Sequence, residues 1–321
     1  LPFGLLLFQR QEARASANPE WFPLFPEWVG LIVLLALAAG MRFYRLSTLS
    51  AWPNFDEGIY SYAAIGLMDK PLAVNFYGNS QAPPGYFWLL AGFFKAFGIS
   101  LKTMWLLPAF LSLLFVPLSW WAARQFLTRS QALGVAVLAG LSFWPLYIGR
   151  FAVMNSTVLP AQVLAMGALG WVLRAKPDEN NMGKWAFFGL TLGIGFYTHH
   201  HWWAVAPVLI LTAWWATRRR GSGWGRCWAL LFLTTAVLLV PLLAAAFRNR
   251  IGGYVANLWA FNSPLSLFQK MYLDFRYIAS LFWGVDSEHC TYQPVWGGFL
   301  NPVLGALFLL GLGQVIRGFR S

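Results

Sequence analysis

Several long apolar runs divide the sequence, and they constrain the fold more than any other feature. Of the 321 residues, 58% are hydrophobic and only 11% are charged. A helix needs about 20 predominantly apolar residues to cross the hydrocarbon core of a bilayer, and several runs approach or exceed this length. Membrane-spanning β-strands would instead appear as short segments of alternating polarity. The sequence therefore predicts an all-α fold, a polytopic transmembrane helical bundle.

The apolar runs predict about eight spans in one transmembrane domain, residues 28–316. Residues 1–27 form a mixed N-terminal lead-in, and residues 317–321 form a short C-terminal end. We expect truncation at both ends, because the sequence lacks an initial methionine and stops soon after the last span. The expected spans are 28–44, 101–123, 131–149, 152–173, 184–198, 202–217, 226–247 and 299–316.

The segment 85–97 is apolar, but its length argues against a full crossing. It has about 14 residues after Pro84. As a helix it would be roughly 20 Å long, which is shorter than the hydrocarbon core. We therefore expect a helix that belongs to a loop and dips into the face of the membrane.

Loop charges favour the same topology. If 85–97 does not cross, Arg124, Arg129 and the run 218–220 all fall on the inner side, as the positive-inside rule requires. The first outer loop is then 47–99 and the second long outer loop is 248–298. The expected location is a bacterial inner (plasma) membrane, with the functional residues on its outer face.

The net charge of +12 does not indicate nucleic-acid binding, because the basic residues fall largely in short loops between apolar runs. The 19 tryptophans and 11 tyrosines suit interfacial belts or a lipid-facing groove. Two cysteines, Cys227 and Cys290, have no metal-binding spacing and are expected on opposite sides of the membrane. Membrane lipids are therefore the expected surroundings, and nucleic acid is not an expected partner.

Two adjacent acids, Asp56 and Glu57, follow the first apolar run in a chain that has few acids. Asn54 stands where a helix N-cap is expected, with Glu57 three residues later, which is the spacing of a capping box. Tyr60, Ala64 and Leu67 then recur at helical spacing. The stretch predicts a short amphipathic helix that ends near residue 68.

Asp56 and Glu57 are the candidate catalytic residues. Neighbouring residues on a helix point about 100° apart. One carboxylate can therefore face an acceptor hydroxyl as general base while the other binds a cation or a partner side chain. The alternative is that both acids only stabilise the first turn of the helix.

The run His199, His200 and His201 lies at an expected outer helix end. Three consecutive histidines on a helix cannot all face one point, so at most two would share a site. They are candidates for contact with a phosphate or for a divalent cation shared with Glu57, with His200 and Glu57 as the possible metal ligands. A solvated interfacial turn is the alternative.

Arginines at expected outer helix ends have two interpretations. Arg150, five residues before Asn155, either snorkels to the interface or clamps an anionic headgroup. Arg42 and Arg45, at the end of the first span, either snorkel or meet a phosphate.

These motifs resemble the GT-C superfamily of membrane glycosyltransferases, in the bacterial glycosyltransferase family 39 branch. Protein O-mannosyltransferases and lipid A aminoarabinose transferases are relatives in that group. The resemblance extends over roughly residues 28–316. The matching residues are Asp56-Glu57-Gly-Ile-Tyr60, Pro83-Pro84-Gly-Tyr-Phe-Trp with Phe97-Gly98-Ile-Ser100, Arg150 with a polar residue five positions on, and the glycine-rich run 189–195.

The resemblance implies an enzyme that transfers a sugar from a polyprenyl-phosphate donor, with inversion, on the outer face of the membrane. It implies that Asp56 is the base or the acid that orients the acceptor, and that the acceptor is a lipid, a glycan or a protein. Arg150 and the three histidines would bind the donor phosphate, and a divalent metal is compatible with this site. The residues that we assign to the acceptor site and groove are Tyr60, Pro83, Pro84, Tyr86 and Asn155.

Two departures keep other functions open. The family commonly has aspartate where this chain has Asn155, and its members often have more spans and a soluble C-terminal domain. An inactive homologue of the superfamily is therefore one alternative. A transporter or lipid flippase is another, although the predicted spans contain few ionisable residues near their centres.

Overall fold

The computed structural model of the chain is helical throughout its described part. The described residues are 25–48, 53–70, 73–76, 82–175, 181–218, 224–248, 265–279, 300, 304–306 and 308–313. The chain forms two compact units, one of residues 20–255 and one that combines residues 1–19 with 256–321. The predicted lead-in, most of the second long loop and the C-terminal end lie largely outside the described residues.

The first unit is a helical bundle. Its helices are α2 (Phe25–Phe43), α3 (Phe55–Gly66), α4 (Gly85–Phe97), α5 (Leu101–Arg124), α6 (Arg129–Leu141), α7 (Phe143–Ile148), α8 (Asn155–Leu173), α9 (Met182–Phe196), α10 (Trp202–Arg218) and α11 (Gly225–Arg248). The helix bounds agree with the predicted runs to within a few residues, except where α6 and α7 divide one predicted span.

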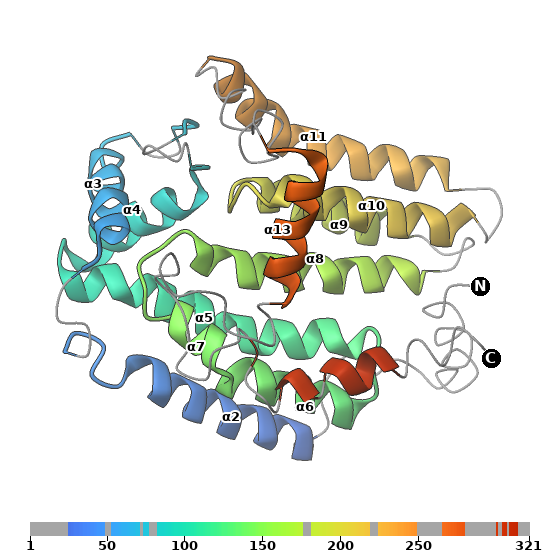
Figure 1. The fold of residues 1–321 in the computed structure, drawn as a ribbon, viewed down its shortest axis with the longest axis horizontal. Helices are drawn as coiled ribbons and strands as arrows, with labels where there is room; N and C mark the ends of the chain where they lie inside the picture. Colours follow the sequence, from blue (N-terminus) through green and yellow to red (C-terminus); the bar gives the residue numbers. More distant parts are fainter. Residues whose placement is uncertain are drawn as a thin grey trace. The chain divides into compact units, whose positions relative to one another are not determined.

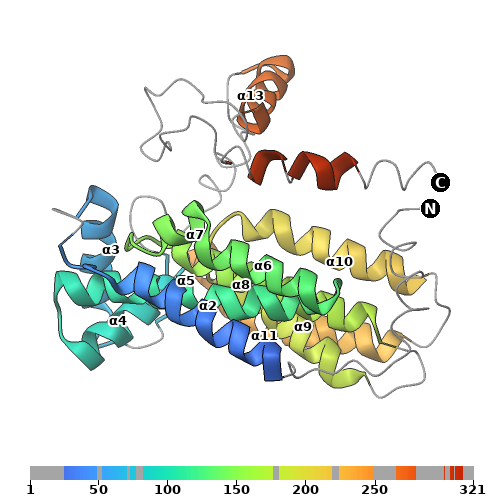
Figure 2. The ribbon, with the colours of Figure 1, turned by 90° about the horizontal axis from the view of Figure 1, so that it is seen from below.

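The long helices of the bundle lie alongside one another, and α3 and α4 pack at one end (Figures 1 and 2). Helix α5 packs against α2, α6 and α8, and α9 packs between α8 and α11. We call the end that carries α3 and α4 the loop end. The turns 149–154 and 197–201 also lie there, because α8 and α10 start at this end.

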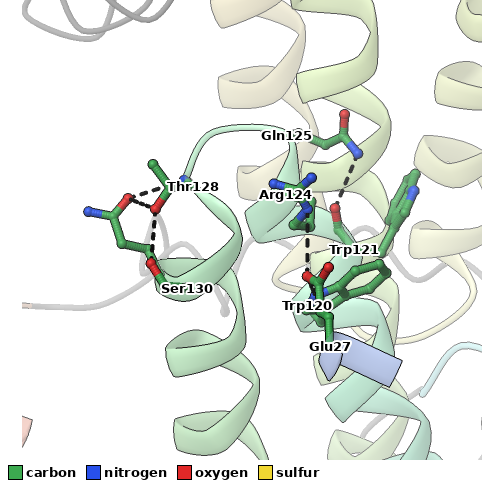
Figure 3. Close-up of polar contacts among 8 residues, drawn as sticks. Glu27, Trp120, Trp121, Arg124, Gln125, Thr128 and Ser130 are labelled. Atoms are coloured by element: carbon green, nitrogen blue, oxygen red, sulfur yellow. Dashed lines mark hydrogen bonds and ion pairs between the residues drawn. The ribbon is translucent and has the colours of Figure 1, made fainter. Parts of the chain in front are cut away.

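Contacts between α2 and α5 show that these two helices run antiparallel. Near the loop end, Arg42 Nε donates to Ser112 Oγ at 2.8 Å. At the opposite end, Trp120 Nε1 donates to Glu27 Oε1 at 3.0 Å, and Arg124 Nε lies 4.0 Å from the same oxygen (Figure 3). The segment with α3 and α4 therefore leaves and re-enters the bundle at the same end, which is the geometry expected if 85–97 does not cross.

The predicted span 131–149 is interrupted at Ser142, which has an extended conformation with ψ of 154° between α6 and α7. Pro145 gives the physical reason. It has no N–H to donate to the carbonyl of Leu141, and its ring would clash with that carbonyl in a continuous helix. The break leaves carbonyl groups at the end of α6 without helical partners.

Arg42 binds those freed carbonyls. Its guanidinium donates to Gly140 O at 2.8 Å and to Ala139 O at 3.4 Å, and the side chain is fully buried. Ser112 extends the connection by donating to Pro145 O at 2.5 Å. The sequence suggested snorkelling or a phosphate contact for Arg42, and that interpretation is wrong, because the guanidinium is engaged inside the bundle.

Three helices in the described part of the chain are long and apolar enough to cross a membrane by length and composition. They are α5, α8 and α11. Two shorter apolar helices are α6 and the segment Leu304–Gly313, which includes part of the predicted span 299–316. The predicted total of about eight spans is therefore not established by helix length and composition.

Close packing of α9 on α11 depends on glycines. A Cβ atom at Gly189 would lie 2.5 Å from Leu231 O, and one at Gly193 would lie 2.8 Å from Leu238 Cβ. Thr235 Oγ1 donates to Gly189 O at 3.0 Å across the same contact. Small residues four positions apart are a common basis for close contact between membrane helices.

The second unit contains α13 (Leu267–Ala279) and the apolar segment Leu304–Gly313. Helix α13 falls within the predicted second long loop. Its side chains are largely exposed.

Replacing Arg42 by methionine should destabilise the bundle by about 2–4 kcal/mol, because buried carbonyls would lose their donors. Arg45→Met is the matched control, since Arg45 is exposed and donates only to the nearby Thr48 Oγ1 among the contacts described. Unfolding of both purified variants in detergent measures the difference. Equal stability of the two variants would show that the Arg42 contacts are not needed.

Candidate functional site

Helix α3 begins with the predicted capping box. Glu57 N donates to Asn54 Oδ1 at 2.9 Å, and Asn54 N donates to Glu57 Oε2 at 2.8 Å. These reciprocal bonds satisfy two backbone N–H groups that a helix start would otherwise leave unpaired. The local sequence is therefore sufficient to start the helix at this point and to fix the direction of both acids.

The second oxygen of Glu57 joins two further parts of the bundle. Glu57 Oε1 accepts a hydrogen bond from Trp105 Nε1 of α5 at 2.9 Å and another from Ala152 N at 2.8 Å. Glu57 is only 1% exposed. Its carboxylate thus accepts three N–H groups in a buried position, which leaves it poorly placed to meet a substrate.

Asp56 lies on the outer side of the same turn and is exposed. Glu57 Oε1 accepts a 2.8 Å hydrogen bond from Ala152 N and so holds α3 to the 149–154 turn. Asp56 precedes Glu57 by one residue, and Arg150 precedes Ala152 by two. The two candidate residues are therefore brought to the same region, although 94 positions separate Asp56 from Arg150 in the sequence.

Four residues assigned to the groove are instead core residues. Tyr60, Pro83, Pro84 and Tyr86 are all buried. The rings of Tyr60 and Tyr86 meet edge to face at 6.0 Å. Burial, with the charge of Glu57 and the neighbouring Tyr60, raises the pKa of Tyr86 well above its usual value. Tyr60 and Tyr86 belong to a buried apolar cluster, and a role of these residues in an acceptor groove stays a prediction.

The Pro-Pro-Gly motif docks α4 onto the histidine turn. Gly85 N donates to Tyr197 O at 2.9 Å, and the Trp88 and Tyr197 rings lie 5.2 Å apart. A Cβ atom at position 85 would stand 2.5 Å from Tyr197 O, so only glycine fits this close approach. Tyr197 is in turn held by its hydroxyl, which donates to Leu238 O at 2.6 Å.

The histidines form a turn between α9 and α10 in which two of the rings are paired. Nδ1 of His199 and Nδ1 of His201 are 2.8 Å apart, which requires one proton between them. His201 Nε2 lies 3.3 Å from Gln162 Nε2 of α8. His200 is buried at 4% exposure, and its ring meets that of His199 edge to face at 5.6 Å. The number of histidines that share a site stays a prediction.

Burial and the neighbouring imidazoles lower the pKa of His199 to about 3. Burial also lowers the pKa of His201. At neutral pH both rings are therefore uncharged, and they can contact a phosphate by donating hydrogen bonds but not as cations.

Arg150 and Asn155 flank Ala152, whose N–H donates to Glu57. Arg150 is partly exposed, and its Nη2 donates to Tyr44 O at the end of α2. Burial lowers the pKa of Arg150, but a guanidinium remains protonated at neutral pH. Asn155 is exposed in the first turn of α8. The dipole of a helix start favours an anion there, although Ser156 N and Thr157 N already donate to Val153 O and Met154 O.

Within the described part of the chain, no group of three or more histidine, cysteine, aspartate or glutamate side chains is arranged to hold a metal ion. Glu57 already accepts three hydrogen bonds, so a metal would have to displace them.

Several supporting residues were missed by sequence reasoning. Trp105 contacts Glu57 and Gln162 contacts His201, while Tyr197 holds the start of α4 through Gly85. Each lies in an apolar or aromatic run, where nothing in the sequence distinguishes it from the other residues of a span. The one usable signal was Gly85 directly after two prolines, which marks a tight backbone approach.

Comparison with known proteins gives a family and a fold. The family model described as dolichyl-phosphate-mannose-protein mannosyltransferase matches residues 70–256. No curated protein sequence matches the chain. Two crystal structures of ArnT from Cupriavidus metallidurans are similar, one bound to undecaprenyl phosphate and one in the apo state.

Each ArnT structure has a TM-score of 0.56 and 18% sequence identity to this chain, and the match covers 74% of this chain. The match covers 45% of the ArnT chain, so this chain spans less than half of that protein's length. The likeness shows an ArnT-like membrane fold, and hence a multi-pass membrane protein.

Replacing Gly85 by alanine should destabilise the protein by about 1–3 kcal/mol, because the added methyl group meets backbone atoms that cannot move independently. Gly92→Ala in the same helix is the matched control, since nothing lies within 4 Å of a Cβ atom there. Thermal unfolding in detergent compares the two. If Gly85→Ala were as stable as Gly92→Ala, α4 would not be docked on the 197–201 turn.

Acid should destabilise the protein through His199. The pKa of about 3 lies below the ordinary 6.5, so the unfolded chain binds the proton first as the pH falls. The stability contribution is complete above pH 6.5 and is lost progressively between pH 6.5 and 3. Between pH 7 and pH 5, His199→Asn should lose less stability than the wild type by the order of 1–2 kcal/mol. Chemical unfolding at both pH values measures this, and an identical loss in both proteins would contradict the shift.

Proposed function

Because the chain belongs to the dolichyl-phosphate-mannose-protein mannosyltransferase family, we propose that it is a membrane glycosyltransferase that uses a polyprenyl-phosphate sugar donor. The observation that supports this most is the convergence at the loop end. Glu57 joins the helix of the exposed Asp56 to the turn that carries Arg150. Gly85 joins α4, which packs on α3, to the histidine turn.

In the proposed reaction, Asp56 acts as the general base or orients the acceptor. The acceptor hydroxyl oxygen attacks the anomeric carbon of the sugar, and its proton passes to the carboxylate of Asp56. The bond between the anomeric carbon and the phosphate oxygen breaks, and the polyprenyl phosphate leaves with the electron pair. The attack comes from the side opposite the leaving group, so the anomeric configuration is inverted.

The donor phosphate is proposed to bind between Arg150, the paired histidines and the start of α8 at Asn155. Arg150 would supply the cationic contact, while neutral His199 and His201 would donate hydrogen bonds. The ArnT structure bound to undecaprenyl phosphate supports a polyprenyl-phosphate ligand for this fold. A phosphate is a good leaving group, so no separate acid catalyst is required.

For Glu57 we propose a positioning role in place of the catalytic or metal-binding role suggested by the sequence. Its oxygens accept hydrogen bonds from the cap of α3, from α5 and from the 149–154 turn. It therefore sets the register between Asp56 and Arg150. We further propose that this end of the bundle faces the outer side of a bacterial inner membrane, with a lipid, glycan or protein acceptor.

The proposal is tested with purified protein and a panel of radiolabelled polyprenyl-phosphate sugars. Asp56→Asn should lower turnover by about a hundredfold or more while the fold is kept, because asparagine is isosteric but cannot take the proton. Asp56 is exposed, so little stability should be lost. Near-normal turnover of Asp56→Asn would overturn its catalytic role.

Glu57→Gln, in contrast to Asp56→Asn, should mainly lower stability. It should destabilise the protein by about 2–4 kcal/mol, because the amide presents one acceptor oxygen to three N–H donors. Trp105→Phe is the matched variant, since it removes one of those donors without altering the acids. Transfer rates and thermal stability are measured together for all three variants. Absence of transfer by the wild type with every donor would favour an inactive homologue or a transport function.

A further inference from the structure

Gln162 of α8 makes a contact with the histidine turn that the proposed reaction does not use. Its amide nitrogen lies 3.3 Å from His201 Nε2, although the two residues are 39 positions apart in the sequence. An amide nitrogen carries two hydrogens and can only donate them. His201 Nε2 must therefore be the acceptor in this hydrogen bond, and it carries no proton of its own.

This assignment fixes the position of the proton on the His201 ring. Burial lowers the pKa of both His199 and His201, so each ring is neutral near pH 7 and has a single N–H. With Nε2 unprotonated, the proton of His201 lies on Nδ1. That atom is 2.8 Å from Nδ1 of His199, to which it donates.

The backbone leads to the same arrangement independently. His201 N donates to His199 Nδ1 at 3.4 Å. A backbone N–H is always a donor, so His199 Nδ1 is an acceptor whichever way the Gln162 amide is turned. The opposite arrangement would place this N–H against a protonated Nδ1, with two donors facing each other. The proton of His199 therefore lies on Nε2.

The chain of hydrogen bonds ends in one N–H that can bind a ligand. It runs from Gln162 to His201 and from His201 to His199. Both ring nitrogens of His201 are engaged in it, whereas the described residues supply no hydrogen-bond partner for His199 Nε2. His199 is partly exposed, so this N–H is the available donor of the pair.

The position of the proton decides which kind of ligand His199 can bind. An imidazole N–H donates to an acceptor such as a phosphate oxygen, whereas an unprotonated ring nitrogen accepts from a hydroxyl or binds a metal ion. The arrangement that Gln162 favours presents an N–H, which suits the anionic phosphate of the proposed donor. It also narrows the histidine contact with that phosphate to His199.

We propose that Gln162 is a positioning residue, which holds the histidine pair in the arrangement where His199 alone presents an N–H to the donor phosphate. The identity of the ligand rests on the proposed function, but the proton positions can be measured without any reaction. Gln162 acts through the two imidazole rings and needs no contact with the sugar or the phosphate.

The first test measures the proton positions in the full-length protein, in detergent near neutral pH. Nitrogen NMR of protein with isotope-labelled histidine separates protonated from unprotonated ring nitrogens, and the His199→Asn and His201→Asn variants assign the signals. His201 should be protonated at Nδ1 and His199 at Nε2. A His201 ring protonated at Nε2 in the wild type would overturn the proposal.

Gln162→Met removes the amide donor and keeps the length of the side chain. The His201 signals should then show both protonation patterns, because Nε2 has lost the donor that keeps it unprotonated. Gln125→Met is the matched control, since the Gln125 amide donates to Trp121 O at the opposite end of the bundle (Figure 3). An unchanged His201 spectrum in Gln162→Met would refute the role of Gln162.

Undecaprenyl phosphate is the probe for the ligand. Its addition should shift the Nε2 signal of His199 and leave that of His201 in place. Gln162→Met should bind it about three- to tenfold more weakly, because only part of the population then has the competent proton arrangement. Gln125→Met should bind it like the wild type. Equal affinity in Gln162→Met, or a shift at His201 Nε2 in place of His199, would overturn the proposal.

Failure of this proposal and failure of the proposed function give different results. If the wild type has the expected proton positions but binds no undecaprenyl phosphate, the polyprenyl-phosphate function is wrong and His199 loses its phosphate contact. If the wild type transfers sugar but His201 is protonated at Nε2, the function stands and the role of Gln162 is overturned.

Discussion

The loop end of the bundle depends on a buried carboxylate that accepts three N–H groups. Glu57 receives one hydrogen bond from its own helix cap, one from Trp105 and one from the backbone of Ala152. A buried carboxylate that lost these donors would retain a large desolvation cost. The three elements are therefore held together, and the neighbouring Asp56 is directed outward by the same turn of helix.

A second buried charge has a comparable role deeper in the bundle. Arg42 binds the carbonyls left free where α6 ends, and Ser112 connects this point to α7. Both charged groups are satisfied mainly by backbone and neutral partners. Together they hold the 142–152 region from two sides, so Arg150 extends from a turn whose position is well defined.

The described geometry divides the candidate residues by accessibility. Asp56 and Asn155 are exposed, and Arg150 is partly exposed, whereas Glu57, Tyr60, Pro83, Pro84 and Tyr86 are buried. A transfer reaction needs accessible groups at the reacting atoms and rigid groups behind them. The loop end has both, and the proposed division between catalysis at Asp56 and positioning at Glu57 follows from it.

The sequence by itself determined the elements whose causes are local. Apolar run length predicted the long helices, and the Asn54–Glu57 spacing predicted the capped start of α3, because both depend on residues within a few positions. The motif around Asp56 also led to the correct family. Only the tertiary structure decided what Glu57 and Arg42 bind, which histidines pair and why position 85 must be glycine. The physical reason is distance along the chain. Ala152 lies 95 positions from Glu57, and Gly140 lies 98 positions from Arg42, so no local pattern records these contacts.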